Sequence, residues 1–254
     1  MLDDELLRNV ERMLGKDLTE ILRDTLLHTG DIPLPKRPAP FERTPRGLSQ
    51  WSSADFITSL RHHAFSGTYP DELPDEINLR GFKEPISRLL TLMQGDGKEH
   101  GRLGVVSLSK DSIILQETSK GTEKSVTMKE RPNLFEPVVI CMHTHPSPRN
   151  QVLSSYHLSP RDFAGFLEVP SSQATIVIAN GLTLLAHKTA ATPCFDGDLE
   201  RRLELLCTKF ETNPTIPRDL RLSRFTAEAC RTLNLGLYAH QHSQHDDIAM
   251  RIEL

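Results

Sequence analysis

Residues 135–146 read FEPVVICMHTHP, an apolar run that ends in two histidines and a proline. An unbroken apolar run of this kind is typical of a strand in the interior of a sheet, with both faces covered. Pro146 ends the strand, because proline lacks the backbone N–H that a strand ladder needs. The stretch therefore predicts a central strand of an α/β fold whose polar end carries His143 and His145.

The neighbouring segments predict the rest of one α/β domain over residues 81–192. Asn180-Gly181 is the strongest two-residue hairpin turn in the chain, and it separates two runs rich in strand-forming residues. The expected elements are a helix at 84–94, strands at 102–109, 111–118 and 125–130, the central strand, a helix at 159–168 and a hairpin at 174–189.

Both ends of the chain predict helical additions to this domain. Residues 1–29 carry apolar side chains at helical spacing, residues 31–46 hold five prolines, and a short helix is expected after Ser53. We expect residues 1–80 to form a helical N-terminal extension whose Pro-rich arm is a candidate binding segment for protein partners. Residues 193–254 are expected to form C-terminal helices and a polar tail. These helices are expected at 196–211 and 218–235.

The composition is that of an ordinary water-soluble protein. Of the 254 residues, 37% are hydrophobic and 25% are charged, and the net charge is −4. A nucleic-acid-binding domain usually has a basic face, so nucleic acid is not an expected partner. No apolar stretch is long enough to cross a bilayer, and the acidic, amphipathic N-terminus does not resemble a secretion signal. We therefore expect no membrane contact and a cytoplasmic location.

The four cysteines do not predict a structural metal site. They are scattered and form no Cys-x-x-Cys pair, which argues against both a zinc ribbon and a disulfide framework. Cys194, Cys207 and Cys230 are expected to be small buried side chains. Cys141 lies on the same face of its strand as the two histidines, where packing below the site is favoured over a role as a softer ligand.

The histidine pair is suited to binding a metal ion. Side chains two residues apart in a strand project from the same face, so His143 and His145 would present two imidazoles side by side. Zinc with three protein ligands keeps a fourth position for water, as hydrolysis requires. The nearest candidate third ligand is Asp162. The plain alternative is a pair of polar residues at the mouth of a sheet.

The segment from Ser159 to Asp162 reads as a helix start, with serine at the N-cap, proline at the first position and an acid at the third. This structural role is compatible with metal binding, because the cap would hold the carboxylate rigidly. The serine hydroxyl could then turn toward a developing oxyanion. An alternative alignment makes His157 the third ligand, but Asp162 is preferred because the helix-forming stretch FAGFLE follows it directly.

Metal-assisted hydrolysis also needs a group that moves protons, usually Glu or His. Glu99 is the best upstream candidate, since it stands at the junction between a predicted helix and the first strand of the domain. The plain alternative is an exposed acid in a turn.

Together these residues resemble the JAMM/MPN+ (Mov34, JAB) metalloproteases. The family pattern is a glutamate near the start of the first strand, then His-x-His-Pro, then Ser-x-x-Asp at a helix start. It is matched here by Glu99, by His143 to Pro146, and by Ser159 to Asp162 after Leu158. The resemblance covers about residues 82–190 and implies an MPN-like (cytidine-deaminase-like) fold, a mixed sheet flanked by helices.

The resemblance implies a role for each residue of the motif. His143, His145 and Asp162 would bind Zn²⁺, Glu99 would be the general acid/base, and Ser159 would help to stabilise the oxyanion. The family hydrolyses peptide or isopeptide bonds, often releasing ubiquitin or ubiquitin-like proteins. A protein substrate, with ubiquitin-like conjugates among the candidates, is therefore expected.

One feature departs from the family pattern. Residues 147–158 form an insertion several residues longer than the family usually has between its proline and its serine. It would lie at the rim of the metal site, where it could act as a lid, a substrate-reading loop or an autoinhibitory plug. Its last residues before Leu158 are Tyr156 and His157.

Other interpretations of the chain remain open. A second polar cluster lies in the tail and consists of His240, His242, His245, Asp246 and Asp247. We interpret it as part of a mobile terminal segment rather than as a second metal site. Besides a zinc peptidase, the motifs allow a metal-free interaction scaffold, as some family members are, or a metallohydrolase of a small molecule or nucleotide. Metal content separates the first two, because an active enzyme should hold about one zinc per chain.

Overall fold

The computed structural model describes most of the chain, and the two predicted features at its beginning lie outside the described part. The helix expected over 1–29 and the Pro-rich arm at 31–46 are among the residues that it does not describe. The described residues are 49–107, 112–128, 136–146, 156–243 and 246–254. Within these ranges, no helix combines the length and the apolar character needed to cross a membrane.

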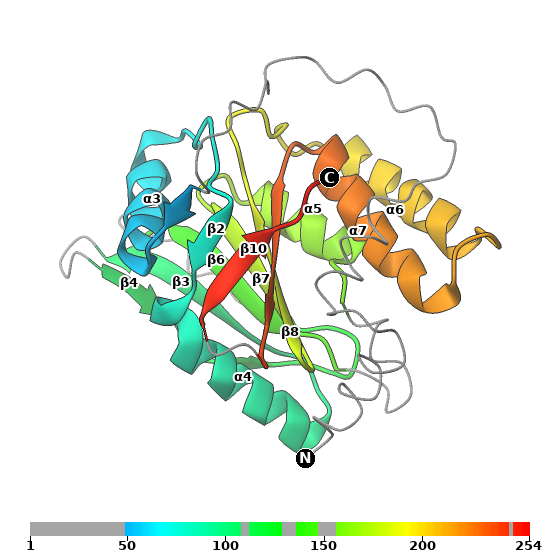
Figure 1. Cartoon of the computed structure of the whole chain (residues 1–254), viewed down its shortest axis with the longest axis horizontal. Helices are drawn as coiled ribbons and strands as arrows, with labels where there is room; N and C mark the ends of the chain where they lie inside the picture. Colours follow the sequence, from blue (N-terminus) through cyan, green and yellow to red (C-terminus); the bar gives the residue numbers. More distant parts are fainter. Residues whose placement is uncertain (1–48, 108–111, 129–135, 147–155, 244–245) are drawn as a thin grey trace.

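The described chain is built around one mixed sheet (Figure 1). The strand order is β1-β2-β10-β9-β8-β7-β6-β3-β4, and β5 pairs with β3 beside β4. The pairs β1/β2 and β6/β7 are parallel, and the other neighbours are antiparallel. The strands are β1 (Gln50–Trp51), β2 (Glu76–Asn78), β3 (His100–Ser107), β4 (Ser112–Leu115), β5 (Ser119–Lys120), β6 (Val138–Thr144), β7 (Ala174–Ala179), β8 (Leu182–His187), β9 (Gly236–Gln241) and β10 (Ile248–Arg251).

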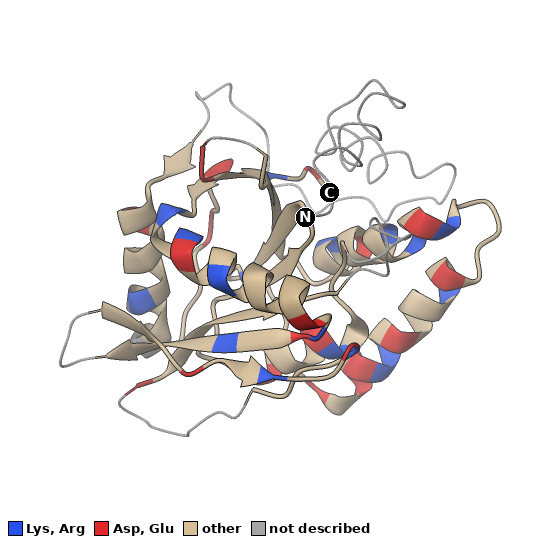
Figure 2. Ribbon diagram, turned by 90° about the horizontal axis from the view of Figure 1, so that it is seen from below, with Lys and Arg blue, Asp and Glu red and all other residues tan. Residues whose placement is uncertain are grey.

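Helices cover both faces of this sheet. Figure 1 shows α3 and α4 on one side and α5, α6 and α7 on the other. The helices are α3 (Ser53–Ser66), α4 (Lys83–Asp96), α5 (Pro160–Glu168), α6 (Gly197–Glu211) and α7 (Arg221–Thr232), with 3₁₀ turns at Arg80–Phe82 and Arg218–Leu220. Exposed charges of both signs lie on α6, where Arg201 and Arg202 pair with Asp198. Figure 2 shows basic and acidic residues interspersed on the ribbon.

The alternation of side chains along the central strands separates two cores. Met142 of β6 and Ile176 of β7 pack into the core beneath α3 and α4, whereas Val177 of β7 packs beneath α5, α6 and α7. From Ile140 to Thr144, odd-numbered residues of β6 therefore face α5 and even-numbered residues face α4. The register shift in the pairing with β3 breaks this alternation at Val139, which packs in the core beneath α3 and α4. This parity places His143 on the α5 side and Thr144 on the α4 side.

Most of the elements expected in the middle of the chain are confirmed. The helix at α4, the central strand β6, the helix at α5 and the hairpin β7–β8 form as predicted. The helix expected after Ser53 forms as α3, with a capping box between Ser52 and Asp55. The fold is thus a mixed α/β architecture with a sheet flanked by helices.

The predictions for the two ends of the chain are wrong in part. The described part of the N-terminal extension is not only helical, because β1 and β2 join the sheet and β2 pairs with β10. The tail is likewise not a mobile polar segment where it is described: His240 and Gln241 are buried residues of β9. These strands are short and pair with distant partners, so local sequence periodicity does not reveal them.

Two smaller predictions are also wrong. Residues 125–128, the described part of the third expected strand, are irregular, and β5 pairs with β3 instead. Cys194 is exposed rather than buried, because it lies in the loop between β8 and α6. Cys207 and Cys230 are buried as expected.

Candidate metal centre

The two histidines of the motif lie at the end of β6 that adjoins α5. His143 and His145 are both buried, with 4% and 8% of their surface exposed. Beyond His143 the chain stays attached to β7, because the N–H of His145 donates to the carbonyl of Ile178 at 2.9 Å. The strand end is therefore held in place where the second imidazole leaves it, and both rings project to the same side, as predicted.

Asp162 is held by the helix start that the sequence predicts. Ser159 is the N-cap of α5, and its Oγ accepts a hydrogen bond from the N–H of Asp162 at 3.2 Å. In return, Oδ2 of Asp162 accepts from the N–H of Ser159 at 2.7 Å. This reciprocal capping box fixes the carboxylate without using all of its lone pairs.

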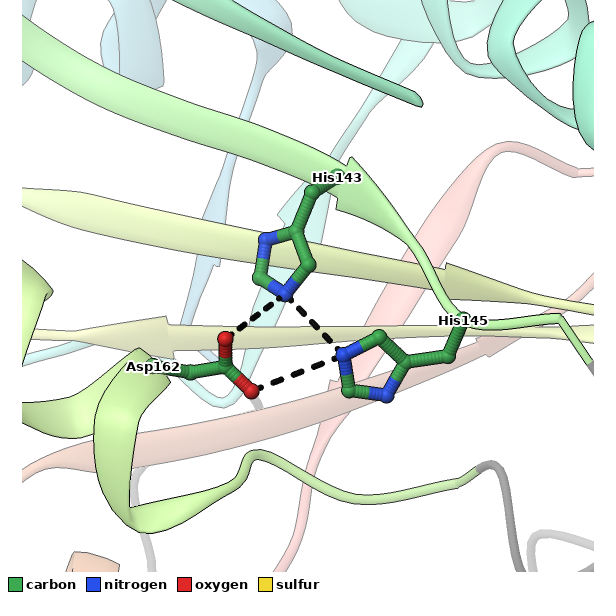
Figure 3. A group of neighbouring side chains, drawn as sticks. All are labelled: His143, His145 and Asp162. Atoms are coloured by element: carbon green, nitrogen blue, oxygen red, sulfur yellow. Dashed lines mark hydrogen bonds and ion pairs between the residues drawn. The ribbon is translucent and has the colours of Figure 1, made fainter. Parts of the chain in front are cut away.

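The three side chains converge on one point (Figure 3). Nε2 of His143 lies 3.1 Å from Nε2 of His145. Oδ1 of Asp162 lies 3.2 Å from Nε2 of His143, and Oδ2 lies 3.5 Å from Nε2 of His145. Two imidazole nitrogens and a carboxylate at these separations could hold a metal ion.

The positive charge on the imidazole and the negative charge on the carboxylate stabilise each other in this group. Burial alone would lower the pKa of the His143 imidazole, but the Asp162 carboxylate overrides burial and holds this pKa well above its usual value. Burial alone would raise the pKa of the Asp162 carboxyl, yet the two imidazoles hold it well below its usual value. Without a metal ion, the group is therefore stabilised by a proton that His143 shares with the carboxylate.

Glu99 reaches the same side of the sheet from the neighbouring strand. It immediately precedes β3, and the β3–β6 register pairs Gly101 with His143, so the alternation of side chains directs Glu99 toward His145. The side chain is buried, which raises the pKa of its carboxyl; the two imidazoles oppose this rise and Asp162 adds to it. The alternative of an exposed turn acid is therefore wrong.

The site thus combines two imidazoles and two carboxylates from three separate segments of the chain. Comparison of the chain with protein-family models, with curated proteins and with solved structures finds no match. What the site can do therefore rests on the chemistry of its own side chains.

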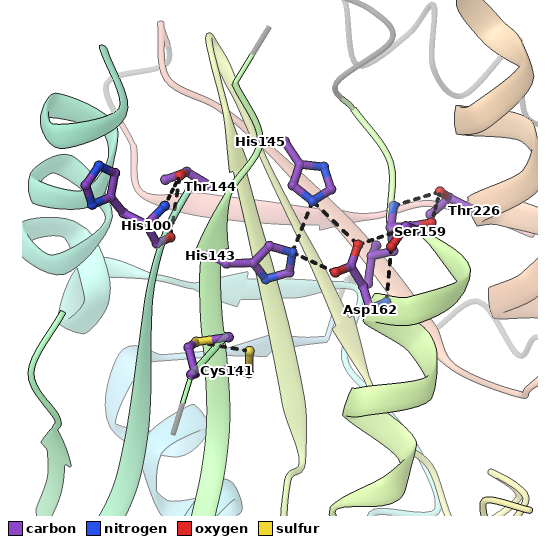
Figure 4. Close-up of polar contacts among 10 residues, drawn as sticks. His100, Cys141, His143, Thr144, His145, Ser159, Asp162 and Thr226 are labelled. Atoms are coloured by element: carbon purple, nitrogen blue, oxygen red, sulfur yellow. Dashed lines mark hydrogen bonds and ion pairs between the residues drawn. The ribbon is translucent and has the colours of Figure 1, made fainter. Parts of the chain in front are cut away.

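The remaining residues expected near the site have structural contacts. Cys141 lies one step below His143 on the same strand face, with Sγ 3.9 Å from the sulfur of Met128, so it packs as expected (Figure 4). The imidazole of His157 lies beside that of His145, with ring centroids 5.0 Å apart. The group whose ligand atoms come together nevertheless consists of His143, His145 and Asp162.

The described end of the insertion is anchored to the fold. The hydroxyl of Tyr156 donates to the carbonyl of Asn180 in the hairpin turn, and the carbonyl of Tyr156 accepts from Oγ of Ser223 on α7 at 3.0 Å. The N–H of Leu158 donates to Oγ1 of Thr226 at 3.0 Å. These bonds set where α5 begins; residues 147–155 lie outside the described part.

The second polar cluster has other hydrogen-bond partners. Nδ1 of His240 lies 3.1 Å from the carbonyl of Ile248, and Nε2 of His242 lies 2.8 Å from Oγ1 of Thr183. His245 lies outside the described residues. Within the described ranges, the group at His143 is the one set of three such side chains close enough to share an ion.

Two features of the site escaped prediction from the sequence. The N–H of Val126 donates to the Glu99 carboxylate, and the hydroxyl of Thr144 bonds to the backbone of His100. The first depends on the path of an irregular loop, for which the sequence carries no signal. The second has a weak signal: an even-numbered polar residue in a strand whose other even positions are apolar.

Proposed function

We propose that this protein is a zinc-dependent hydrolase of peptide or isopeptide bonds, of the JAMM/MPN+ type, with an MPN-like fold. The observation that carries the proposal is the spacing of the three ligand atoms. Ligands about 2.05 Å from zinc at tetrahedral angles lie about 3.3 Å apart. The observed separations of 3.1, 3.2 and 3.5 Å fall on either side of this value.

The donor types fit zinc as well as the spacing does. Two imidazole nitrogens with one carboxylate oxygen are a common ligand set of catalytic zinc, which keeps one position open. His143, His145 and Asp162 would hold the ion. A zinc ion bound there would make a water molecule acidic near neutral pH and would polarise the scissile carbonyl.

Glu99 is the residue proposed to move the proton. It would accept a proton from the attacking water and deliver it to the amine that leaves when the C–N bond breaks. A carboxyl whose pKa is raised by burial is suited to carrying a proton between these two steps. The Val126 N–H faces this carboxylate and opposes part of the rise in the pKa of its carboxyl.

Ser159 is proposed to stabilise the negative charge that develops on the carbonyl oxygen. Its Oγ accepts from the N–H of Asp162, which leaves the hydroxyl hydrogen to donate. The cap and the oxyanion contact can therefore coexist in one side chain. The proposed substrate is a protein, with ubiquitin-like conjugates as the first to test.

Metal analysis of the purified chain, paired with hydrolysis assays, tests the proposal. The probes are a lysine-linked ubiquitin dimer, a fluorogenic C-terminal amide of ubiquitin and an unconjugated peptide. We expect about one zinc per chain and cleavage of at least one probe that stops when zinc is chelated and returns when it is restored. A protein without affinity for zinc would instead be a scaffold, and one that binds zinc but cleaves none of the probes would contradict the proposed reaction.

A further inference from the structure

The pairing of β3 with β6 changes at the site. After a register shift between Val105 and Gly104, the regular register runs from Gly104 opposite Ile140 to Gly101 opposite His143, and it ends there. One residue further, the backbone N–H of His100 does not donate to a carbonyl of β6. It donates to the side-chain Oγ1 of Thr144 at 2.8 Å, and the same hydroxyl lies 3.4 Å from the carbonyl of His100.

Thr144 is thus a fully buried threonine between two strand ends. It points to the α4 side of the sheet, away from the imidazoles of His143 and His145 on either side of it, as Figure 4 shows. Its hydroxyl accepts from the buried backbone N–H of His100 and lies within reach of the His100 carbonyl, so it takes part in satisfying the backbone at this strand end.

The residues next to this contact are the ones that matter for the proposed reaction. Glu99 precedes His100, and His145 follows Thr144. In a regular antiparallel pair, residues directly opposite each other have Cβ atoms about 4.5–5.5 Å apart. The Thr144 hydroxyl accepts the His100 N–H in place of a carbonyl of β6, and such a side-chain acceptor would hold the two strand ends further apart than a direct N–H to C=O bond.

We propose that Thr144 is a positioning residue that sets the separation of Glu99 from His145. Its hydroxyl opens the strand pair by a defined amount, leaving room for the attacking water between the carboxylate and the imidazole. Other contacts hold the two strand ends from outside. On the β6 side, His145 is bonded to Ile178 of β7. On the β3 side, the His100 imidazole lies 3.0 Å from Oδ1 of Asp96, which pairs with Lys120 of β5.

This inference rests on the proposed function, and its test separates the two. Thr144→Val keeps the shape but removes the hydroxyl, and Thr144→Ser restores the hydroxyl. Thr183→Val is the matched control, because Thr183 is equally buried on the same face of the sheet and its hydroxyl bonds to His242, away from β3. All variants are made in the full chain.

Three measurements are made on each variant. Hydrogen exchange in the metal-free protein reports whether the N–H of His100 has lost its acceptor. Zinc content reports metal binding, and kcat and KM on the cleaved probe report the effect on turnover. The visible absorption spectrum of the cobalt-substituted protein needs no substrate and reports the surroundings of the ligands.

We expect Thr144→Val to exchange faster at His100, to keep about one zinc, and to lose about 10- to 100-fold in kcat with KM within about twofold. Its cobalt spectrum should shift. Thr144→Ser should recover most of the kcat, and Thr183→Val should resemble the unmodified protein in all three measurements.

Two results would overturn the proposal. The first is faster hydrogen exchange at His100 in Thr144→Val with kcat and the cobalt spectrum both unchanged. In that case, loss of the hydrogen bond between Thr144 and His100 would have no effect on the site. The second is an equal loss in Thr144→Val and Thr183→Val, which would reflect general destabilisation. If the unmodified protein binds zinc but cleaves no probe, the proposed function fails alone, and the cobalt spectra decide whether Thr144 positions the site.

Discussion

Oδ1 of Asp162 lies 3.2 Å from Nε2 of His143, and this contact raises the pKa of the imidazole against the effect of burial. Near neutral pH the metal-free protein therefore carries a proton on His143 that zinc must displace. We predict that zinc binding releases this proton and that the apparent affinity rises with pH, about tenfold per pH unit for one displaced proton. Calorimetry in buffers of different ionisation enthalpy measures the release, and binding heats that do not depend on the buffer would contradict it.

Substitutions of Glu99 and of His145 should differ in their effects on zinc binding and on turnover. Glu99→Gln is expected to keep about one zinc and to lose at least about 100-fold in turnover, because the amide cannot carry the proton. His145→Ala is expected to lose both metal and activity. The exposed Glu123→Gln, in the loop beside Glu99, is the matched control and should behave normally. Full activity of zinc-loaded Glu99→Gln would rule out the assigned mechanism.

Stability should fall in mild acid because of a histidine far from the site. His187 is fully buried beside Trp51 and Phe56, and burial lowers the pKa of its imidazole to about 4. An unfolded histidine titrates near 6.5, so the unfolded chain binds the extra proton between these values. The free energy of unfolding should therefore decrease as pH falls from 6.5 to 4, by about 3 kcal/mol from this group.

Denaturant titrations across this pH range measure the effect of His187. His187→Phe should flatten the dependence on pH, and His62→Phe, at an exposed histidine, should leave it unchanged. A residual slope is expected from His242, whose pKa burial also lowers to about 4. If His187→Phe kept the full slope, the assignment to His187 would be wrong.

The loop that holds Glu99 depends on a glycine. A Cβ at Gly121 would come within 2.0 Å of the backbone oxygen of Ser125, so Gly121→Ala must move the backbone that carries Val126. We expect a loss of about 1–3 kcal/mol in the free energy of unfolding, together with reduced turnover.

Gly165→Ala is the control for this change. It lies inside α5 with open space around its Cβ position, and alanine there should stabilise the protein by up to about 1 kcal/mol. Denaturant titration compares the two variants. Equal stability of Gly121→Ala and the unmodified protein would show that the loop adapts without cost.

Much of the site could be predicted because its parts are local. Side chains two residues apart in a strand share a face, which placed His143 and His145 together. A serine three residues before an acid forms a capping box within one helical turn, which placed Asp162 at a rigid helix start. Both arguments depend on backbone geometry over a few residues, and the sequence carries that information directly.

Tertiary structure alone decided how these parts meet. His157 and Asp162 were both candidates for the third ligand, and the anchoring of the chain before α5 on α7 brought Asp162 to the histidines. The entry of β1, β2, β9 and β10 into the sheet, and the contact of Thr144 with His100, were equally invisible in the sequence. Such pairings join residues far apart in the chain, so burial and packing of the whole fold select them rather than local propensity.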